Sequence, residues 1–246
     1  MISITGDKET QIIDHIMEKI ISKSIEPEEK LPSENKLAQK YDVPRMTARK
    51  ALTILEERGY IYSKQGKGRF LKQASRPIQL NLTGNTSFTD KMKQAGYDLT
   101  TTTMYCEPIA YDKKVFDLLQ AGVNDSIYKI GRLRYIDREP IAIHQSFVSE
   151  AKFPTISDEG PGIVSMFDYY RSLGYKAFTS NQTFLSITFP TSDEQQQLVC
   201  GSMVPLIVVE SDCLDAETNE RLEHTKILYR SDKFKYDITM KEAGEG

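Results

Sequence analysis

The segment from residue 45 to residue 58 constrains the fold more strongly than any other part of the sequence. Placed on a helix at about 100° per residue, its small and apolar residues fall on one side: Ala48, Ala51, Leu52 and Leu55. Arg49 and Lys50 fall on the opposite side, with Arg45 at the edge. The segment is therefore predicted to be a helix that packs through one side and leaves a basic side exposed.

Two further helices are predicted before this segment. Apolar residues recur at intervals of three and four between Ile12 and Ile21, which predicts an amphipathic helix over about 8–24. Ser33 is placed to cap a second helix over about 34–41, with Glu34 near its positive end. A short turn over 42–44 leads into the third helix, where Pro44 is tolerated because first-turn amides have no intrahelical acceptor.

Positive charge is concentrated in one short stretch of the chain. The whole sequence carries a net charge of -3, yet residues 45–72 hold 8 basic and 2 acidic residues. After the third helix, residues 60–62 and 69–71 are predicted to be short strands around a glycine-containing tip, which together form a wing. A solvated basic surface would give the same charge count, so the prediction of a winged helix-turn-helix rests on the patterning.

The basic side chains near the start of the third helix occupy the place from which a recognition helix contacts base edges. Arginine can donate two hydrogen bonds to guanine, and Thr47 can reach a phosphate or a thymine methyl group. The alternative for Arg45 and Arg49 is a solvated surface position. In the wing, glycine allows close approach of the backbone to a groove, and phosphates would be neutralised by Lys64, Lys67 and Arg69.

Three segments, residues 31–34, 44–52 and 66–70, resemble the DNA-binding domain of the GntR family in order and spacing. The resemblance implies that Arg45, Thr47, Arg49 and Gly66 contact DNA. Asn35 and Pro44 depart from the arginine and the serine or threonine that many members carry, which leaves base preference and helix capping open. The full predicted DNA-binding set is Arg45, Thr47, Arg49, Lys50, Lys64, Gly66, Lys67 and Arg69.

The sequence changes character after a polar connector at residues 74–77. Segments rich in β-branched and aromatic residues follow at 98–106, 126–136, 140–148, 182–189, 205–214 and 221–230. Helical patterns separate them at about 86–95, 112–120, 163–173 and 191–198. We therefore predict an α+β chain: a winged helix-turn-helix domain over 1–73, a linker over 74–77, and a domain over 78–246 with an antiparallel sheet and flanking helices.

Short segments within residues 78–238 resemble, in order, the UTRA effector domain of the HutC branch of the GntR family, which is named for its likeness to chorismate lyase. They lie at 86–89, 132–134, 140–143, 165 and 223–232. The resemblance implies dimerisation and an effector-binding set of Ser87, Phe88, Thr89, Arg132, Arg134, His144, Ser165, Glu223 and Tyr229. Sugar-phosphate sensors of this branch often carry glutamate where this chain has His144. The histidine implies either that the ligand presents a different chemical group at this point, or that His144 is a core residue whose hydrogen bonds are made by a neighbour.

The chemistry of these residues also predicts a binding site for an anion. Arg132 and Arg134 are two apart on a predicted strand and so point to one face, where their forked donors could converge on a phosphate or carboxylate. Ser87 and Thr89 at a helix N-terminus add hydroxyls and amides. In the alternative, Ser87 only caps the helix and the arginines face solvent or pair with acidic residues. Glu223, likewise, could bond the ligand or form a structural pair with Tyr229.

Composition and motifs exclude several other classes of protein. No apolar run approaches the ~20 residues of a membrane span, the N-terminus lacks a secretory pattern, and Cys106, Cys200 and Cys213 lack metal-ligand spacing. A cytoplasmic protein with reduced thiols and without cofactor, metal or catalytic residues is predicted. The alternative, an enzyme of chorismate lyase-like fold with a DNA-binding appendage, has no nucleophile–base, metal or phosphate-loop motif in support.

The favoured function is a homodimeric transcription regulator that binds an operator with an inverted repeat. A small anionic metabolite, such as a sugar phosphate, would act as its effector. Release from the operator is expected on ligand binding, and corepression is left open.

Overall fold

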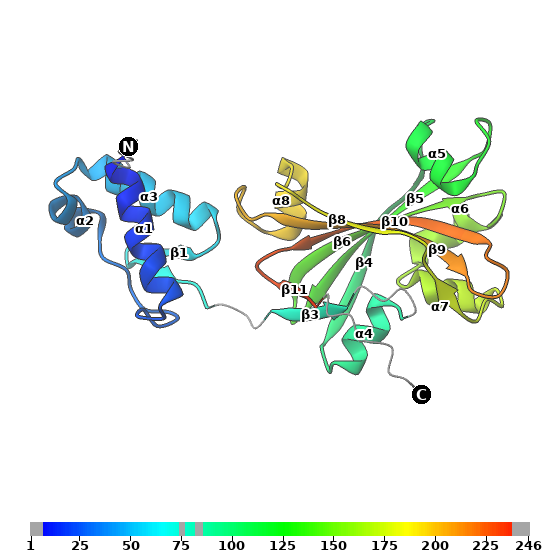
Figure 1. Cartoon of the computed structure of the whole chain (residues 1–246), viewed down its shortest axis with the longest axis horizontal. Coiled ribbons are helices and arrows are strands. Elements are labelled where there is room, and N and C mark those ends of the chain that lie inside the picture. The colour runs from blue at the N-terminus through cyan, green and yellow to red at the C-terminus, as the bar shows by residue number, and fades with distance from the viewer. Residues whose placement is uncertain (1–6, 74–76, 82–85, 238–246) are drawn as a thin grey trace, which may run out of the picture. The chain divides into compact units, whose positions relative to one another are not determined.

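The computed structural model describes residues 7–73, 77–81 and 86–237 (Figure 1). It divides into two compact units: Met1–Pro77 with Phe189–Pro205, and Ile78–Thr188 with Leu206–Gly246. The predicted domain boundary at residue 73 and the linker after it fall close to the first division, although residues 74–76 lie outside the described residues.

The first unit contains the predicted three helices and wing. Its elements are α1 (Lys8–Ile21), α2 (Glu34–Tyr41), α3 (Arg45–Glu57), β1 (Ile61–Lys64) and β2 (Gly68–Leu71). The Ser33 side chain caps α2 by accepting a hydrogen bond from the backbone N–H of Lys36 at 3.3 Å. Residues from all three helices form one apolar core, which includes Ile12, Ile16, Leu37, Ala48, Leu52 and Leu55. The apolar side of α3 is thus buried as its pattern predicts.

The wing is an antiparallel hairpin whose tip depends on glycine. Strand β1 pairs with β2 from Ile61 opposite Leu71 to Lys64 opposite Gly68. Gly66 and Gly68 have φ angles of 71° and 110°, a region that residues with a Cβ rarely adopt. The same unit also groups α8 (Ser192–Leu198), which begins with a capping box between Thr191 and Glu194.

The second unit is built on a seven-stranded sheet in which every strand pair is antiparallel. The strand order is β4 (Leu99–Pro108), β5 (Ile127–Ile136), β6 (Glu139–Ser149), β10 (Arg221–Arg230), β9 (Leu206–Asp215) and β7 (Phe178–Thr179). The seventh strand, β8 (Thr183–Thr188), also pairs with β9. The predicted α+β class with an antiparallel sheet is confirmed (Figure 1).

Helices cover both faces of this sheet. On one face α5 (Lys113–Leu119) packs its Val115 and Phe116 against Ile127 and Phe147. The other face carries α4 (Phe88–Gln94), α6 (Ile156–Glu159), the short 3-10 helix η1 (Gly160–Gly162) and α7 (Met166–Ser172). Side chains alternate along a strand, so His144, three residues from Phe147, points to the side opposite α5.

One pairing in this unit has no local signal in the sequence. Strand β3 (Ile78–Asn81) pairs in parallel with β11 (Phe234–Asp237), although more than 150 residues separate them. Ile78, Leu80 and Phe234 join Met92 of α4 in one apolar cluster. The pair therefore closes the side of the sheet on which α4 lies.

Strand β5 passes beneath an aromatic ring at a position that only glycine can fill. Gly131 pairs with Tyr105 next to an irregularity in the β4–β5 register. A Cβ atom at Gly131 would lie 2.2 Å from Cζ of Tyr105, whose hydroxyl accepts a hydrogen bond from Nε2 of Gln145 at 3.0 Å. The ring is thus held over the bare backbone.

We predict that Gly131→Ala lowers the free energy of unfolding by about 1–3 kcal/mol, because the ring must leave its place. In a Tyr105→Ala background the same substitution is expected to have a much smaller effect, since the colliding atoms are gone. Urea unfolding of the four proteins completes the cycle. Equal losses in both backgrounds would contradict this account of the position.

Candidate functional site

A groove of about 550 Å³ in the first unit collects most of the predicted DNA-binding residues. The start of α3, the loop before α2 and the wing form its walls. Arg45, Arg49, Lys64, Gly66, Lys67 and Arg69 line it, together with Lys30 and Asn35. Thr47 and Lys50 lie on α3 outside this lining, the former partly buried and the latter exposed. The structure brings six of the eight residues together, and their contact with DNA stays a prediction.

Glu34 links the recognition helix to the wing. Its carboxylate accepts hydrogen bonds from Nε of Arg45 at 2.8 Å and from Nη1 of Arg69 at 3.2 Å. Partial burial opposes ionisation, but these two arginines outweigh it and lower the pKa of Glu34. Arg69 also bonds Glu56 at 3.2 Å and Thr53 at 3.3 Å.

The two arginines differ in how far they can serve an external partner. The side chain of Arg45 is 68% exposed, whereas that of Arg69 is 16% exposed. Arg69 therefore holds the wing against α2 and α3 in the free chain, a role that the sequence reasoning did not foresee. Arg49 and Lys67 are exposed, and neither takes part in an ion pair with another residue of the part that the structure describes. Their charges face solvent.

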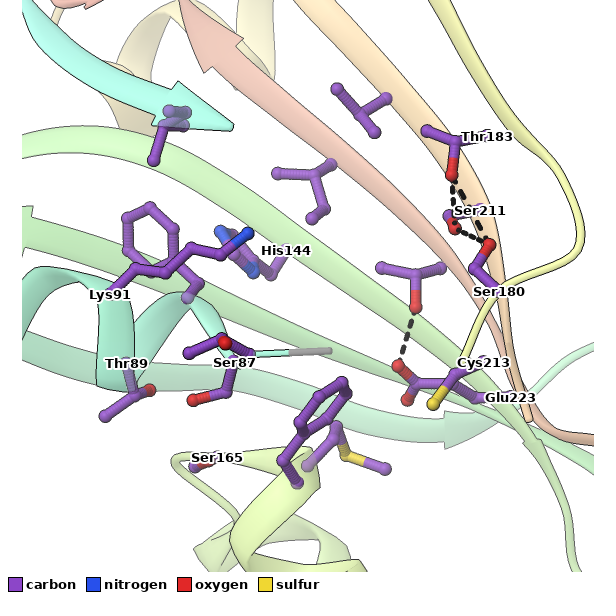
Figure 2. Close-up of a pocket in the computed structure, with 18 of the residues that line it drawn as sticks. Ser87, Thr89, Lys91, His144, Ser165, Ser180, Thr183, Ser211, Cys213 and Glu223 are labelled. Atoms are coloured by element: carbon purple, nitrogen blue, oxygen red, sulfur yellow. Dashed lines mark hydrogen bonds between the residues drawn. The ribbon is translucent and has the colours of Figure 1, made fainter. Parts of the chain in front are cut away.

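The second unit holds a cavity of about 160 Å³ on the sheet face opposite α5. Strands β5, β6, β9 and β10 form its floor, and α4 and the start of α7 stand over it (Figure 2). All nine predicted effector-binding residues line it: Ser87, Phe88, Thr89, Arg132, Arg134, His144, Ser165, Glu223 and Tyr229. Their convergence is a finding of the structure, and their binding of a ligand stays a prediction.

The two arginines in the cavity wall are buried, and neither is bonded to a carboxylate of the described residues. Arg132 is 2% exposed and Arg134 is 3% exposed. Arg132 donates to the Ser146 hydroxyl, while Nη1 of Arg134 donates to Thr101 Oγ1 at 2.6 Å and to the Val164 carbonyl at 2.8 Å. These partners are all neutral, and the Nε atom of each guanidinium has no hydrogen-bond partner in the part of the chain that the structure describes. The alternatives of solvent exposure or pairing with an acidic residue are not realised.

This arrangement makes the charged state of both arginines costly. Burial, with the like charge of Arg132 adding to it, lowers the pKa of Arg134 to about 9. Burial also lowers the pKa of Arg132, an effect that the charge of Glu223 partly offsets. A buried charge of this kind is compensated best by an opposite charge brought into the site. The cavity is therefore suited to an anion.

His144 lies directly opposite Arg132 in the β5–β6 pairing. Its ring is buried, and its edge packs against Phe88 at 4.8 Å and Tyr229 at 5.6 Å between centroids. Nε2 has no hydrogen-bond partner. Burial, with the charges of Arg134 and Arg132 adding to it, holds the pKa of His144 well below its usual value. The imidazole is thus neutral at pH 7, so one ring nitrogen donates a hydrogen bond and the other accepts one.

The predicted hydroxyl and carboxylate groups of the cavity have partners in the chain. Ser87 caps α4 by accepting from the N–H of Asp90 at 2.9 Å, and Ser165 caps α7 by accepting from Asp168 at 3.3 Å. Both keep a hydroxyl proton to donate. The cap on Ser87 is the alternative that the sequence left open.

Glu223 forms a structural pair with a tyrosine other than the predicted one. It accepts from the hydroxyl of Tyr170 at 2.9 Å and from that of Thr225 at 2.6 Å. Tyr229 packs instead among the rings of Phe88, His144 and Phe234.

Several residues of the cavity were not predicted from the sequence. Lys91 lies one helical turn after Ser87, and partial burial lowers its pKa. A hydroxyl cluster stands at the other end: Ser211 lies 2.9 Å from Ser180 and 3.0 Å from Thr183 (Figure 2). Helical spacing from Ser87 could have identified Lys91. The cluster could not be found in this way, because it depends on the pairing of β8 with β9.

No helix in the described part of the chain is long and apolar enough to cross a membrane. Nor do three or more His, Cys, Asp or Glu side chains gather there as metal ligands.

Two protein families match this chain. Residues 94–235 match the UTRA domain, and residues 8–71 match the bacterial regulatory proteins of the gntR family. The UTRA match covers most of the strands and helices that form the cavity. The lining residues outside it are Leu80, those from Thr86 to Lys91, and Tyr236. The second match covers the three helices and the wing.

Curated relatives and solved structures agree with these matches. The chain is 25% identical over 226 residues to the HTH-type transcriptional repressor NagR of Bacillus subtilis (strain 168), over 92% of this chain and 91% of that protein. It is 29% identical over 147 residues to the mannosyl-D-glycerate transport/metabolism system repressor MngR of Escherichia coli (strain K12), over 60% of each chain.

The fold is similar to that of PhnF from Mycobacterium smegmatis, with a TM-score of 0.59, 17% identity, and coverage of 94% of this chain and 99% of that one. It is also similar to that of the possible transcriptional regulator YydK from Bacillus subtilis subsp. subtilis str. 168. That comparison has a TM-score of 0.56, 22% identity, and coverage of 96% and 100%.

The buried charges generate a prediction about stability. Without an anion, Arg134→Met should raise the free energy of unfolding, because a buried and uncompensated charge is removed. Below pH 9 Arg134 is protonated in both the folded and the unfolded chain. Above about pH 9 Arg134 stays protonated only in the unfolded chain, so the stability of the wild-type protein gains relative to that of the variant and the difference between them should narrow. Thermal unfolding between pH 7 and 10 tests this, with the exposed Arg58→Met as control. A destabilised Arg134→Met protein at pH 7 would contradict it.

Proposed function

Because the chain belongs to the GntR family of bacterial regulatory proteins and carries a UTRA domain, we propose that it is a transcriptional repressor released from its operator by a small anionic metabolite. Its class as a DNA-binding regulator with an effector-binding domain follows from the family. The relatives NagR and MngR are named repressors, which supports repression here. These relatives are regulators, so the alternative of an enzyme with a DNA-binding appendage is not favoured. We further propose that the protein works in the cytoplasm.

The groove of the first unit supports binding to DNA. Arg49 and Lys67 present charge from α3 and the wing that forms no ion pair with another described residue. Arg45 remains mostly exposed although it is bonded to Glu34. The helix would read base edges in the major groove while the wing contacts phosphates. A homodimer would place two such domains on the half-sites of an inverted repeat, about 34–36 Å apart for one helical turn.

One observation carries the proposal for the effector: two buried guanidiniums share a cavity wall with neutral partners only. Lys91 adds a third cation to the lining, and Glu223 and Asp212 contribute two carboxylates. Glu223 is already bonded to Tyr170 and Thr225, and Asp212 accepts from the Ser180 hydroxyl. A phosphate ester carries enough negative charge to offset the two arginines and can accept their forked donors. The cavity therefore suits a phosphate better than a neutral ligand.

The opposite end of the cavity supports a ligand rich in hydroxyl groups. Ser180, Thr183 and Ser211 can each donate and accept hydrogen bonds there. A sugar phosphate combines an anionic end with such a polar body. MngR is named for a sugar derivative, mannosyl-D-glycerate, which is in keeping with this class of effector.

His144 would adapt the site to a particular head group. A glutamate at position 144 would attract an amine of the ligand. His144 is neutral and lies beside two arginines, so a positively charged ligand group is disfavoured there. We propose that the ligand group next to His144 is a hydroxyl, a carbonyl or an acid. The effector would then carry no amino group at the position next to His144.

The proposal for DNA binding makes a direct prediction. Arg49→Ala should weaken operator binding by about 1–3 kcal/mol, because an exposed arginine on the recognition helix is lost. Arg58→Ala is the matched control, since Arg58 is also exposed but lies at the far end of the same helix. Affinity for the operator should also fall steeply with salt. Gel-shift titrations with the operator and a scrambled duplex measure both effects, and equal affinity for the two duplexes would refute sequence-specific binding.

The proposal for the effector makes a second prediction. Arg134→Ala should abolish binding of a sugar phosphate, while operator binding stays at the wild-type level. By linkage, a ligand that weakens operator binding must itself bind more weakly to the operator complex by the same factor, typically about 5–150-fold. Calorimetry with a panel of sugar phosphates, and with the same sugars without phosphate, identifies the ligand. Identical operator affinity with and without that ligand in the wild-type protein would show that the cavity does not control DNA binding.

A further inference from the structure

A second cavity of about 220 Å³ lies on the sheet face that carries α5, opposite the cavity proposed for the effector (the effector cavity). His224 of β10 identifies this face, because it pairs with Phe147 of β6 and stacks on its ring, against which α5 packs. The walls of the second cavity come from α5, β9, β10 and residues 181–184. Strands β9 and β10 thus contribute to both cavities, since side chains alternate between the two faces of a sheet.

Buried polar atoms that lack hydrogen bonds gather at these two cavities. In the part of the chain that the structure describes, six buried side-chain nitrogen or oxygen atoms have no hydrogen-bond partner. Three belong to residues of the effector cavity, and two belong to residues of the second cavity, namely Nε of Arg221 and Nδ1 of His224. Buried polar groups in folded proteins are nearly always hydrogen-bonded. The second cavity therefore shows the same sign of an absent partner as the first.

His224 is buried beside the cavity without a hydrogen bond to hold it. Its residue is 5% exposed, and its Nε2 lies 3.9 Å from Oε1 of Glu210, beyond hydrogen-bonding distance. Burial lowers the pKa of His224, and the charge of Glu210 only partly offsets this effect. The ring is therefore neutral at pH 7 and offers one donor and one acceptor.

The charged groups of the second cavity balance one another. Nζ of Lys114 lies 2.8 Å from Oε1 of Glu210. Nη2 of Arg221 lies 3.6 Å from Oδ2 of Asp212. Two cations thus face two carboxylates, in contrast to the two adjacent arginines of the effector cavity. A ligand with a net charge would find no uncompensated opposite charge here, so the second cavity suits an uncharged ligand.

The remaining groups match a ligand that carries many hydroxyls. Nη1 of Arg221 donates to the carbonyl of Leu118, which leaves Nε as an unused donor beside the neutral ring of His224. The side-chain amides of Asn181 and Gln182, which are exposed, can donate and accept as well. Leu118 adds an apolar contact. Hydroxyl groups both donate and accept, so an uncharged sugar satisfies this combination of donors, acceptors and apolar wall.

We propose that the second cavity is a further ligand site of this protein, and that it binds an uncharged sugar while the effector cavity binds an anion. Binding of the sugar does not depend on the proposed function. Its consequence for the effector rests on that function, because it requires the effector cavity to be occupied in turn.

One short segment of chain contributes to both cavities. Oδ1 of Asp212 accepts from the hydroxyl of Ser180 at 2.8 Å. The same oxygen accepts from the backbone N–H groups of Asn181 at 3.0 Å and Gln182 at 3.2 Å. Ser180 lines the effector cavity (Figure 2), whereas Asn181 and Gln182 line the second one. Ligands in the two cavities would therefore contact one segment held by a single carboxylate, and each is expected to change the affinity for the other by the same factor.

The three histidines of the chain allow both cavities to be observed in the wild-type protein. His15 lies in the first unit, His144 in the effector cavity and His224 in the second cavity. D-glucose, D-mannose, D-galactose and inorganic phosphate are titrated separately into the full-length protein with isotope-labelled histidine, at constant pH. At least one sugar should shift the NMR signals of His224 saturably and leave those of His15 in place. Phosphate should shift the signals of His144.

The outcomes separate this site from the proposed function. A response of His144 to phosphate, without a response of His224 to any of the three sugars, would overturn the second site and leave the anionic effector standing. Sugars that shift His144 alone would also overturn it, because they would then bind in the effector cavity. Phosphate affinity that is the same with and without a bound sugar would overturn the link between the cavities.

Variants of the full-length protein locate the bound sugar independently. Arg221→Met keeps an apolar stem but removes the donors, so it should weaken sugar binding about tenfold or more and leave phosphate binding in the absence of sugar unchanged. Arg134→Ala should have the opposite effects. Lys113→Met is the matched control, since it removes a cation from α5 that is 77% exposed and outside the cavity lining. Full sugar affinity in Arg221→Met would overturn the site, and the histidine signals of the wild-type protein decide if this variant fails to fold.

Discussion

The guanidiniums of Arg132 and Arg134 are held side by side in the interior of the second unit, and only neutral groups bond them. Each buried charge opposes folding unless something compensates it, and the like charge of its neighbour adds to that cost. The domain must therefore supply enough apolar packing elsewhere to hold them in place. It does so with three apolar clusters, which lie on both faces of the sheet.

The geometry of the sheet places the rest of the cavity around this pair. Residues two apart on β5 share one face, and the β5–β6 pairing sets His144 opposite Arg132. Strand β10 contributes Glu223 and Tyr229 from the next position in the sheet. The capped starts of α4 and α7 then bring Ser87 and Ser165 over the same space. The anionic effector that we propose would offset the charges of the two arginines, and its binding would then stabilise the domain.

Sequence reasoning was most successful where local pattern and face geometry suffice. The apolar period of the first three helices, the basic side of α3 and the strand pattern of the second unit all predict elements that the structure contains. It was less successful where the contacts of a side chain depend on residues that are far away in the sequence. The contact of Arg69 with DNA phosphates stays a prediction, but its bonds to Glu34 and Glu56 could not be foreseen, because the positions of these residues relative to the wing follow only from the packed helices.

The same limit applies within the cavity. Glu223 bonds Tyr170 of α7, a contact across 53 residues that no local pattern reveals. The hydroxyl cluster of Ser180, Thr183 and Ser211 exists only because β8 pairs with β9. The nine predicted residues converge because they came from a resemblance that already reflects the three-dimensional site. The alternation of side chains alone indicates which residues share a face, and it does not indicate which face is hollow.

Thermal unfolding with added oxyanion tests most directly whether an anion compensates the buried charges of Arg132 and Arg134. Inorganic phosphate is titrated at constant ionic strength, with chloride as the balancing anion. A protein whose cavity binds phosphate gains stability as the ratio of free phosphate to its dissociation constant rises. We expect the unfolding temperature of the wild-type protein to rise with phosphate, and that of a variant combining Arg132→Met and Arg134→Met to stay unchanged. An equal response of the two proteins, or none beyond that to chloride, would contradict the account.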